Sequence, residues 1–268
     1  GEFAWSSNFN ISFNKNKVLE VGVDGRPIYG SAANANNAFI TKPGYPIASF
    51  YGYKYIGVFQ SEEELAKYPH LSGDKVGDGR YEDVNKDGVL DQNDKTILGD
   101  NNPLFTAGFS NSFSYKNFTL DIQFTGSYGA EVFSFYKRMC GIYHGDRNGM
   151  IEQLGRWQSK DQPGDGIHFR PTRTPSGWQR DPSSAWVQDA SYLRLRNLTL
   201  GYNFDQKVLD KMKMKGLRLY VTGQNLFTIT NYVGYDPETS SESGLAQGGD
   251  YLGYPAARSF IIGANITF

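Results

Sequence analysis

One twelve-residue segment of the sequence has the composition and spacing of a calcium-binding loop. Oxygen-bearing side chains stand at its first, third, fifth, ninth and twelfth positions, and a glycine stands at its sixth. The expected ligands, with a backbone carbonyl at the seventh position, are Asp83, Asn85, Asp87, Val89, Asp91 and Asp94. A hard cation such as Ca²⁺ prefers six or more oxygen ligands, and the glycine lets the chain turn sharply around it. We therefore expect a structural calcium ion as a cofactor of the loop 83–94.

The same residues also fit a turn without metal. Asp94 stands where calcium loops usually carry Glu, and its shorter side chain reaches less far toward a cation. Two long amphipathic helices do not flank the segment, so a calcium-driven switch is not expected. A metal-free turn rich in Gly, Asp and Asn therefore stays open beside the calcium site.

No set of residues in the sequence points to catalysis. His70, His144 and His168 lie in unrelated contexts, and Cys140 has no companion signature. Two carboxylates suffice for glycoside hydrolysis, but no spacing singles out such a pair. We predict that the chain is not an enzyme.

The overall charge argues against a nucleic-acid partner. Lys and Arg number 27 against 28 Asp and Glu, so there is no basic excess to neutralise phosphates. The sequence has no run of 18 apolar residues, so we expect no transmembrane helix. A mean hydropathy of −0.52 is typical of a soluble protein. A membrane β-barrel has the same property, because its polar and apolar residues alternate.

Alternation with period two is the dominant pattern of the chain, and it predicts β-strands. The eight candidate strands are 2–14, 17–23, 48–59, 104–115, 118–136, 190–204, 217–230 and 259–268. A helix is expected over 62–68, because Ser61 and Glu64 have the spacing of a capping box. A helical turn is expected over 207–215.

The two faces of these strands differ in composition. One is aromatic and aliphatic, and in the central strands its members are Phe109, Phe113, Phe118, Ile122 and Phe124. The other is small, polar and mostly neutral, and its members there are Ser110, Ser112, Asp121, Gln123 and Thr125. This pattern favours a membrane barrel with lipid outside and a wet lumen inside. The alternatives are a self-contained eight-strand barrel, or a secreted, soluble β-sandwich that binds calcium and carbohydrate.

Four of the predicted connections are long, namely 24–47, 60–103, 137–189 and 231–258, and the calcium-loop segment is an insertion in the second. Because the first two are consecutive, they cannot both lie outside a barrel unless a strand between them is missed or one excursion is periplasmic. The connection 137–189 resembles either a ligand vestibule or a loop with its own aromatic core. Its relevant side chains are Tyr143, His144, Trp157, His168, Trp178 and Trp186.

Several segments, in order and spacing, resemble the C-terminal part of the SusC/RagA-type TonB-dependent outer-membrane transporters of Bacteroidetes. These segments are 49–54, 57–59, 80–88, 103–109, 115–118, 190–202, 223–228 and 234–238. Together they extend over nearly the whole chain, which is far more specific than a single motif.

The resemblance implies a fold, a location and partners. The fold class would be all-β, with residues 1–268 forming the last eight or nine strands of a 22-strand transmembrane antiparallel barrel with long extracellular loops. The chain would lack the plug, the TonB box and the early strands, and would not transport alone. It would lie in the Gram-negative outer membrane, in contact with outer-membrane lipid. Its partners would be a SusD-like surface lipoprotein, the TonB complex through the missing N-terminal part, and a glycan or peptide ligand.

Overall fold

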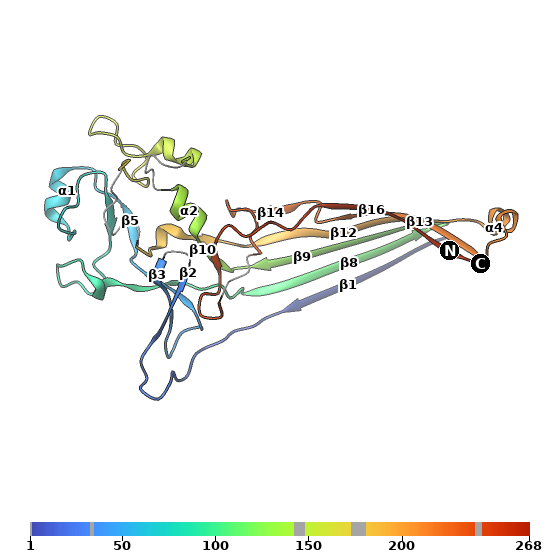
Figure 1. The fold of residues 1–268 in the computed structure, drawn as a ribbon, viewed down its shortest axis with the longest axis horizontal. Helices are drawn as coiled ribbons and strands as arrows, with labels where there is room; N and C mark the ends of the chain where they lie inside the picture. The colour runs from blue at the N-terminus through green and yellow to red at the C-terminus, as the bar shows by residue number, and fades with distance from the viewer. Residues whose placement is uncertain (1, 33–34, 142–147, 173–180, 239–242) are drawn as a thin grey trace.

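The computed structural model describes residues 2–32, 35–141, 148–172, 181–238 and 243–268. They form a long twisted sheet with a cap of small sheets and short helices at one end (Figure 1). Helix α4 (Gln206–Met212) lies at the opposite end of the sheet, called the far end below.

The long sheet is antiparallel throughout and has the order β1-β8-β9-β12-β13-β16. Its strands are β1 (Phe3–Ser12), β8 (Phe105–Tyr115), β9 (Phe118–Tyr128), β12 (Tyr192–Asn203), β13 (Gly216–Gln224) and β16 (Ser259–Thr267). The short strand β14 (Thr228–Thr230) pairs with the cap end of β12. Each long strand is therefore hydrogen-bonded to the next long strand in the chain.

The pairing register carries the period-two pattern across all six strands. One row of directly paired residues is apolar throughout and consists of Trp5, Phe113, Leu120, Leu200, Val221 and Ile262. Another row is polar throughout and consists of Asn8, Ser110, Gln123, Asn197, Gln224 and Ser259. The sheet thus has one apolar face and one polar face, and the two predicted sets of β8 and β9 residues lie on opposite faces as expected.

A β-bulge at Arg196 keeps these faces aligned along β12. Leu195 pairs with Phe124 and Asn197 pairs with Gln123, so Arg196 is an extra residue without a paired partner in β9. A side-chain period of two means that one inserted residue exchanges the faces of everything beyond it. The bulge therefore lets two apolar stretches of opposite parity in β12 both reach the apolar face.

Two paired polar side chains, Ser7 and Asn111, lie within the apolar face, and Asn111 is flanked along β8 by Phe109 and Phe113. The indole nitrogen of Trp5 donates a hydrogen bond to Asn111 Oδ1 at 3.0 Å. Because this bond satisfies both groups, the amide costs less at this position than an unpaired one would.

The cap has three small sheets. The first is β2 (Ile28–Ala32), β3 (Ala35–Thr41), β4 (Ser49–Gly52) and β7 (Thr96–Gly99). The second is β5 (Tyr55–Val58) with β6 (Gly79–Tyr81), and the third is β11 (Val187–Asp189), β10 (Glu131–Ser134) and β15 (Gly249–Asp250). Its helices are α1 (Glu62–Lys67) and α2 (Phe135–Cys140), with 3-10 turns η1 (Gln92–Asp94), η2 (Ile151–Gly155) and η3 (Ser184–Trp186).

Two of the eight predicted long strands are wrong. Residues 17–23 form no strand, and 48–59 forms the short strands β4 and β5 of the cap. Without these two long strands, the chain leaves the long sheet after β1, forms part of the cap, and returns to the sheet at β8. The consecutive long connections therefore need neither a missed crossing nor a periplasmic excursion. The pattern misled because short cap strands alternate as long strands do.

The remaining long strands match their predicted ranges closely, with two interruptions. The range 118–136 is broken at Gly129, whose φ of +83° turns the chain from β9 into β10. The range 217–230 is broken at Asn225, with a φ of +51°, between β13 and β14. Both expected helical segments are present, and Ser61 caps α1 by accepting a hydrogen bond from the Glu64 backbone N–H.

In the part of the chain that the structure describes, every helix is too short or too polar to pass through a bilayer.

The cap has a hydrophobic core dominated by aromatic rings. Phe39, Phe50, Phe133 and Phe135 are fully buried, and Phe133 contacts the other three with ring centroids 5.2–6.2 Å apart. The same cluster includes Phe169 and Trp186 from the connection 137–189. The long connections thus fold together as a packed unit, as the alternative of a structured loop predicts.

Truncation of Phe133 tests this packing. Phe133→Ala should destabilise the cap by about 3–5 kcal/mol, because it removes a buried ring and leaves a cavity. Hydrogen exchange of the cap amides would measure the loss. Ile151→Ala, at a side chain that is 82% exposed, is the control and should cost less than about 0.5 kcal/mol. Equal effects of the two variants would show that the cap has no packed core.

Candidate functional site

The polar face of the long sheet carries a cluster of charged side chains near the cap. Its centre is Arg194 of β12, whose side chain is only 3% exposed. The guanidinium group of Arg194 binds Asp236 through Nη2, Glu238 Oε2 through Nη1 at 3.0 Å, and Thr228 Oγ1 through Nε at 2.9 Å. A buried cation with all three nitrogens paired is well compensated.

Arg196, the bulge residue, joins the same cluster. Its Nη2 lies 2.5 Å from both carboxylate oxygens of Glu238, and its Nε donates to Thr125 Oγ1 at 3.0 Å. Arg194 and Arg196 share a face because they are two residues apart, and the bulge makes this the polar face, where Glu238 contacts both guanidinium groups. We call Arg194, Arg196, Asp236 and Glu238 the arginine clamp.

Asp236 is held in its charged form. Burial alone would raise the pKa of its carboxyl group, but hydrogen bonds from the Ala256 backbone, Arg194 and the Glu238 backbone outweigh this effect. The net result is a pKa below the usual aspartate value. The ion pair with Arg194 therefore persists at neutral pH.

A second attachment holds the segment 231–258 to the cap. The Tyr232 hydroxyl binds the carboxylate of Asp250, which is 3% exposed, and lies 3.4 Å from Ser134 Oγ. Burial and the bond to Asp250 raise the pKa of Tyr232, so this tyrosine stays protonated and remains a donor. The arginine clamp and this tyrosine together fix the segment at the cap end of the polar face.

Toward the far end, the polar face carries a looser group of side chains. Arg218 donates to Thr119 Oγ1 at 3.1 Å and lies 3.9 Å from Asp121, which accepts a bond from Ser112. These residues line an open hollow of about 370 Å³. Their side chains are part-exposed, so the ion pair contributes little to stability.

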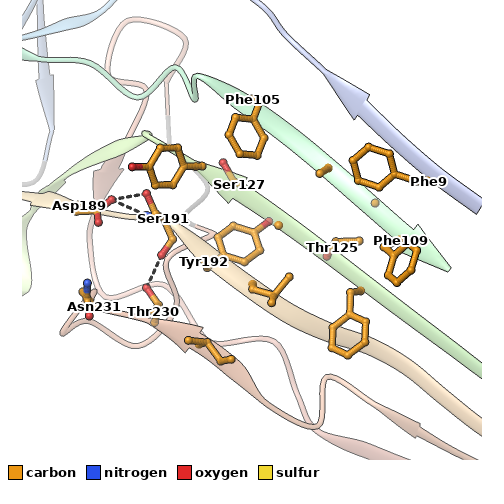
Figure 2. Close-up of a pocket in the computed structure, with 17 residues that line it drawn as sticks. Phe9, Phe105, Phe109, Thr125, Ser127, Asp189, Ser191, Tyr192, Thr230 and Asn231 are labelled. Carbon is orange, nitrogen blue, oxygen red and sulfur yellow. Dashed lines mark hydrogen bonds between the residues drawn. The ribbon is translucent and has the colours of Figure 1, made fainter. Parts of the chain in front are cut away.

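On the opposite, apolar face, a hollow of about 470 Å³ lies just below the cap (Figure 2). Ala107 of β8 and Gly126 of β9 are paired there, and their small size leaves a gap between the rings of Phe105, Phe109 and Phe124. The polar edge toward the cap includes Asp189, Ser191 and Thr230, which are linked by hydrogen bonds of 2.5–2.8 Å. This hollow therefore lies outside the polar face.

The predicted calcium ligands lie together in the cap, in one turn with bonds of its own. Asp83 accepts from the backbone N–H groups of Lys86 at 2.6 Å and Gly88 at 2.9 Å. Asp94 is fully buried and accepts from Val84 at 2.9 Å and from Asp91 at 2.8 Å. Asn85 and Asp87 are hydrogen-bonded to each other, and Gly88 has a φ of +84° that suits the turn.

These bonds show how the turn keeps its shape, and Asp94 holds both of its ends. Across the described residues, no three His, Cys, Asp or Glu side chains converge as metal ligands would. The side chains have the chemistry that calcium prefers, but their oxygens face backbone N–H groups. Calcium binding at 83–94 stays a prediction.

The described candidate residues of the connection 137–189 lie close together at the cap core, where the Trp157 backbone N–H donates to the His168 carbonyl at 3.0 Å and both His168 and Trp186 line one small cavity. Trp186 is buried in the cap core, and Trp157 packs against that core. His168 Nδ1 lies 2.6 Å from Asp165, and its Nε2 lies 3.7 Å from Glu152. Tyr143, His144 and Trp178 lie outside the described residues.

Sequence reasoning did not single out the arginine clamp. Its arginines are two residues apart on one strand, and its carboxylates follow about 40 residues later. The only available signal was a pair of charged residues on an otherwise neutral face. Their meeting depends on the bulge and on the return of 231–258, and neither is visible in the alternation.

Comparisons with known proteins agree with this architecture. A receptor named TonB-dependent receptor P3, from Formosa agariphila, is 34% identical over 278 residues, covering 100% of this chain and 27% of that protein. TonB-dependent receptor SusC of Bacteroides thetaiotaomicron is 26% identical over 276 residues, covering 100% of this chain and 25% of SusC. The chain is a relative of the SusC/RagA-type TonB-dependent receptors. It spans about a quarter of the length of the curated receptors that it matches.

Solved structures of this receptor family share the fold. The RagAB peptide transporter matches with a TM-score of 0.78 at 20% identity, over 100% of this chain and 27% of that one. The RagAB peptide importer in its 'open-open' state matches with a TM-score of 0.75 at 22% identity and the same coverage. No protein-family model matches the chain. The predicted antiparallel barrel fold is confirmed, with six long strands described here rather than eight or nine.

The arginine clamp yields a direct test. Arg194→Met should destabilise the attachment of 231–258 by about 3–5 kcal/mol, because it leaves buried Asp236 without its cation. Hydrogen exchange in 231–238 of the intact receptor would report the loss. Arg218→Met, which removes a part-exposed guanidinium, is the matched control and should cost less than about 1 kcal/mol. If the two variants cost the same, Arg194 is not a buried anchor.

Calcium binding is tested by its effect on stability. If Asp83 and Asp87 are ligands, calcium at about 100 times its Kd should stabilise the cap by about 2.7 kcal/mol, and Asp83→Asn with Asp87→Asn should abolish this gain. Thermal unfolding with calcium and with a chelator measures both. Asp24→Asn, at an exposed carboxylate elsewhere in the cap connection, should leave the gain intact. No response of the unaltered protein to calcium would show that 83–94 is a metal-free turn.

Proposed function

We propose that the chain forms part of the barrel wall and the outer cap of a TonB-dependent outer-membrane importer of glycans or peptides. The supporting observation is the six-strand sheet with one continuous apolar face and one mostly neutral polar face. In this proposal the apolar face meets outer-membrane lipid in a Gram-negative cell and the polar face lines the lumen. The relatives are named as receptors and importers, which supports a transport role over an enzymatic one.

Strand length supports a membrane-spanning role. The six long strands have 9 to 12 residues each. A tilted strand needs about 9–11 residues to cross the hydrocarbon core of a bilayer. The apolar band therefore has the height that a bilayer requires.

Exposure of the apolar face argues against the soluble sandwich. Trp5 is 61% exposed and Ile262 is 84% exposed, and no second sheet packs on this face among the described residues. An apolar face of this size in a soluble protein would need a cover. The sheet path also ends at β1 and β16 without pairing them, which does not favour a self-contained eight-strand barrel.

The cap suits contact with a surface partner. Ile151, Leu154 and Ile167 are exposed apolar side chains on the connection 137–189. Exposed apolar residues grouped on a surface often mark protein interfaces. We propose a SusD-like lipoprotein as the partner at the cap, with TonB acting through parts of the receptor outside this chain. Both glycan and peptide remain possible ligands, since SusC and the RagAB peptide importer are both among the similar proteins.

Two adjacent substitutions in β9 test the orientation. Ile122→Arg on the apolar face should cost about 2–4 kcal/mol of membrane-inserted stability, whereas Gln123→Arg on the polar face should cost much less. The measurement is the amount of folded receptor in the outer-membrane fraction, followed by unfolding in lipid. A receptor found outside that fraction, or equal costs at both positions, would contradict the proposal.

A further inference from the structure

Arg258 stands beside a hollow at the cap end of the sheet, just before β16. The hollow has a volume of about 360 Å³. The lining strand residues include Arg194, Thr228 and Thr230, which belong to the polar face. A hollow of this size can hold a single sugar or amino-acid unit, at the lower end of the range for ligand pockets.

Among the described residues that line this hollow, cations outnumber carboxylates. Arg194 and Arg196 are paired with Asp236 and Glu238 in the arginine clamp. Arg258 is exposed, and no carboxylate of the described residues forms an ion pair with it. Two guanidinium groups, of Arg194 and Arg258, line the hollow with one carboxylate, Asp236, which Arg194 already binds; among the described lining residues the unpaired charge is therefore that of Arg258.

The neighbours of Arg258 hold its backbone in place. The side-chain amide of Asn225 donates to the Ala257 carbonyl at 3.1 Å, and the Ala256 backbone N–H donates to Asp236 at 3.0 Å. The two residues before Arg258 are thus tied to β13 and to the arginine clamp. Arg258 therefore lines the hollow from a fixed backbone, and the lining carboxylate, Asp236, is already paired with Arg194.

An aromatic ring completes the hollow. Tyr235 lines it, is 62% exposed, and packs on Tyr136 in a tilted arrangement with ring centroids 5.9 Å apart. A guanidinium group binds a carboxylate in a bidentate manner, and an exposed ring contacts the apolar side of a sugar or amino acid. Cation and ring on the same hollow match a ligand that has an anionic group and a flat or apolar body.

We propose that this hollow is a subsite for a carboxylate group of the imported ligand, bound by Arg258, with Tyr235 contacting the unit that carries it. The inference rests on the proposed transport function and makes it more specific. The carboxylate could belong to a uronic acid of a glycan or to an acidic side chain of a peptide. The experiment distinguishes these two sources.

The test uses the full-length receptor, purified with its surface partner in detergent, and measures ligand affinity by calorimetry. The glycan arm compares an oligouronate with the same oligosaccharide reduced to its neutral form. The peptide arm compares a Glu-containing tripeptide with its Gln counterpart. Arg258→Gln should weaken binding of the charged ligand of one arm by roughly tenfold or more, and leave its neutral counterpart unchanged.

Two further variants guard against indirect effects. Arg258→Lys keeps the charge and should restore part of the affinity, and the preference for the charged ligand should decline with added salt. Lys211→Gln removes an exposed cation of α4 at the far end and should change neither affinity. A response in the glycan arm alone identifies a uronate ligand, and one in the peptide arm alone identifies an acidic peptide.

Two results would overturn the subsite. One is unchanged affinity of Arg258→Gln for the charged ligands, and the other is an equal loss for charged and neutral ligands. Either result could occur in a receptor that still inserts and imports, so it would leave the proposed function standing. Absence of the receptor from the outer membrane would instead contradict the proposed function itself.

Discussion

The hydrogen-bonded register of six antiparallel strands is the constraint on which the rest of the molecule depends. A strand that slips by one residue turns every apolar side chain to the polar face, because successive side chains point to opposite sides. The rows that contain Trp5 and Ser110 show that the register is kept across all five pairings. It holds through β12 only because the bulge at Arg196 absorbs one residue. The opposed faces, the aromatic hollow and the arginine clamp all follow from this register.

The cap and the sheet are stabilised by different interactions. The cap buries aromatic rings, with Phe133 at the centre of its core, and behaves as a small globular protein does. The sheet buries little by itself, because the apolar side chains of one face are largely exposed and the polar row lies on the other face. The arginine clamp lies where the two meet, and it ties the segment 231–258 to strands that belong to the sheet. Charge pairing thus adds to apolar packing in this segment, since Ala246 lies in the cap core and Tyr232 packs with Val132 and Ala190.

Alternation in the sequence was sufficient to predict the long strands, because each has nine or more residues with two consistent faces. The predicted range 2–14 became β1, and 259–268 became β16, with ends displaced by two residues or fewer. The alternation gave a wrong prediction at 17–23 and 48–59. These short segments have the same local pattern, but their pairing is decided by distant neighbours. The arginine clamp was not predictable for a related reason, since Arg194 and Glu238 meet only after the chain has left the sheet and returned. The turn 83–94 was located by its spacing, but spacing alone does not distinguish ligands from hydrogen-bond acceptors.

The long separation along the chain between the two halves of the arginine clamp has a consequence for assembly. Arg194 and Arg196 belong to β12, whereas Asp236 and Glu238 come later in the chain, after β13 and β14. If β12 continued back from Leu198 without its bulge, both arginine side chains would point to the apolar face, away from the two carboxylates. The completed cluster is therefore possible only when the preceding strands are correctly aligned. The arginine clamp therefore links the segment 231–238 to β12 only in the correct register, and a misaligned β12 would lose the ion pairs of both arginines at once.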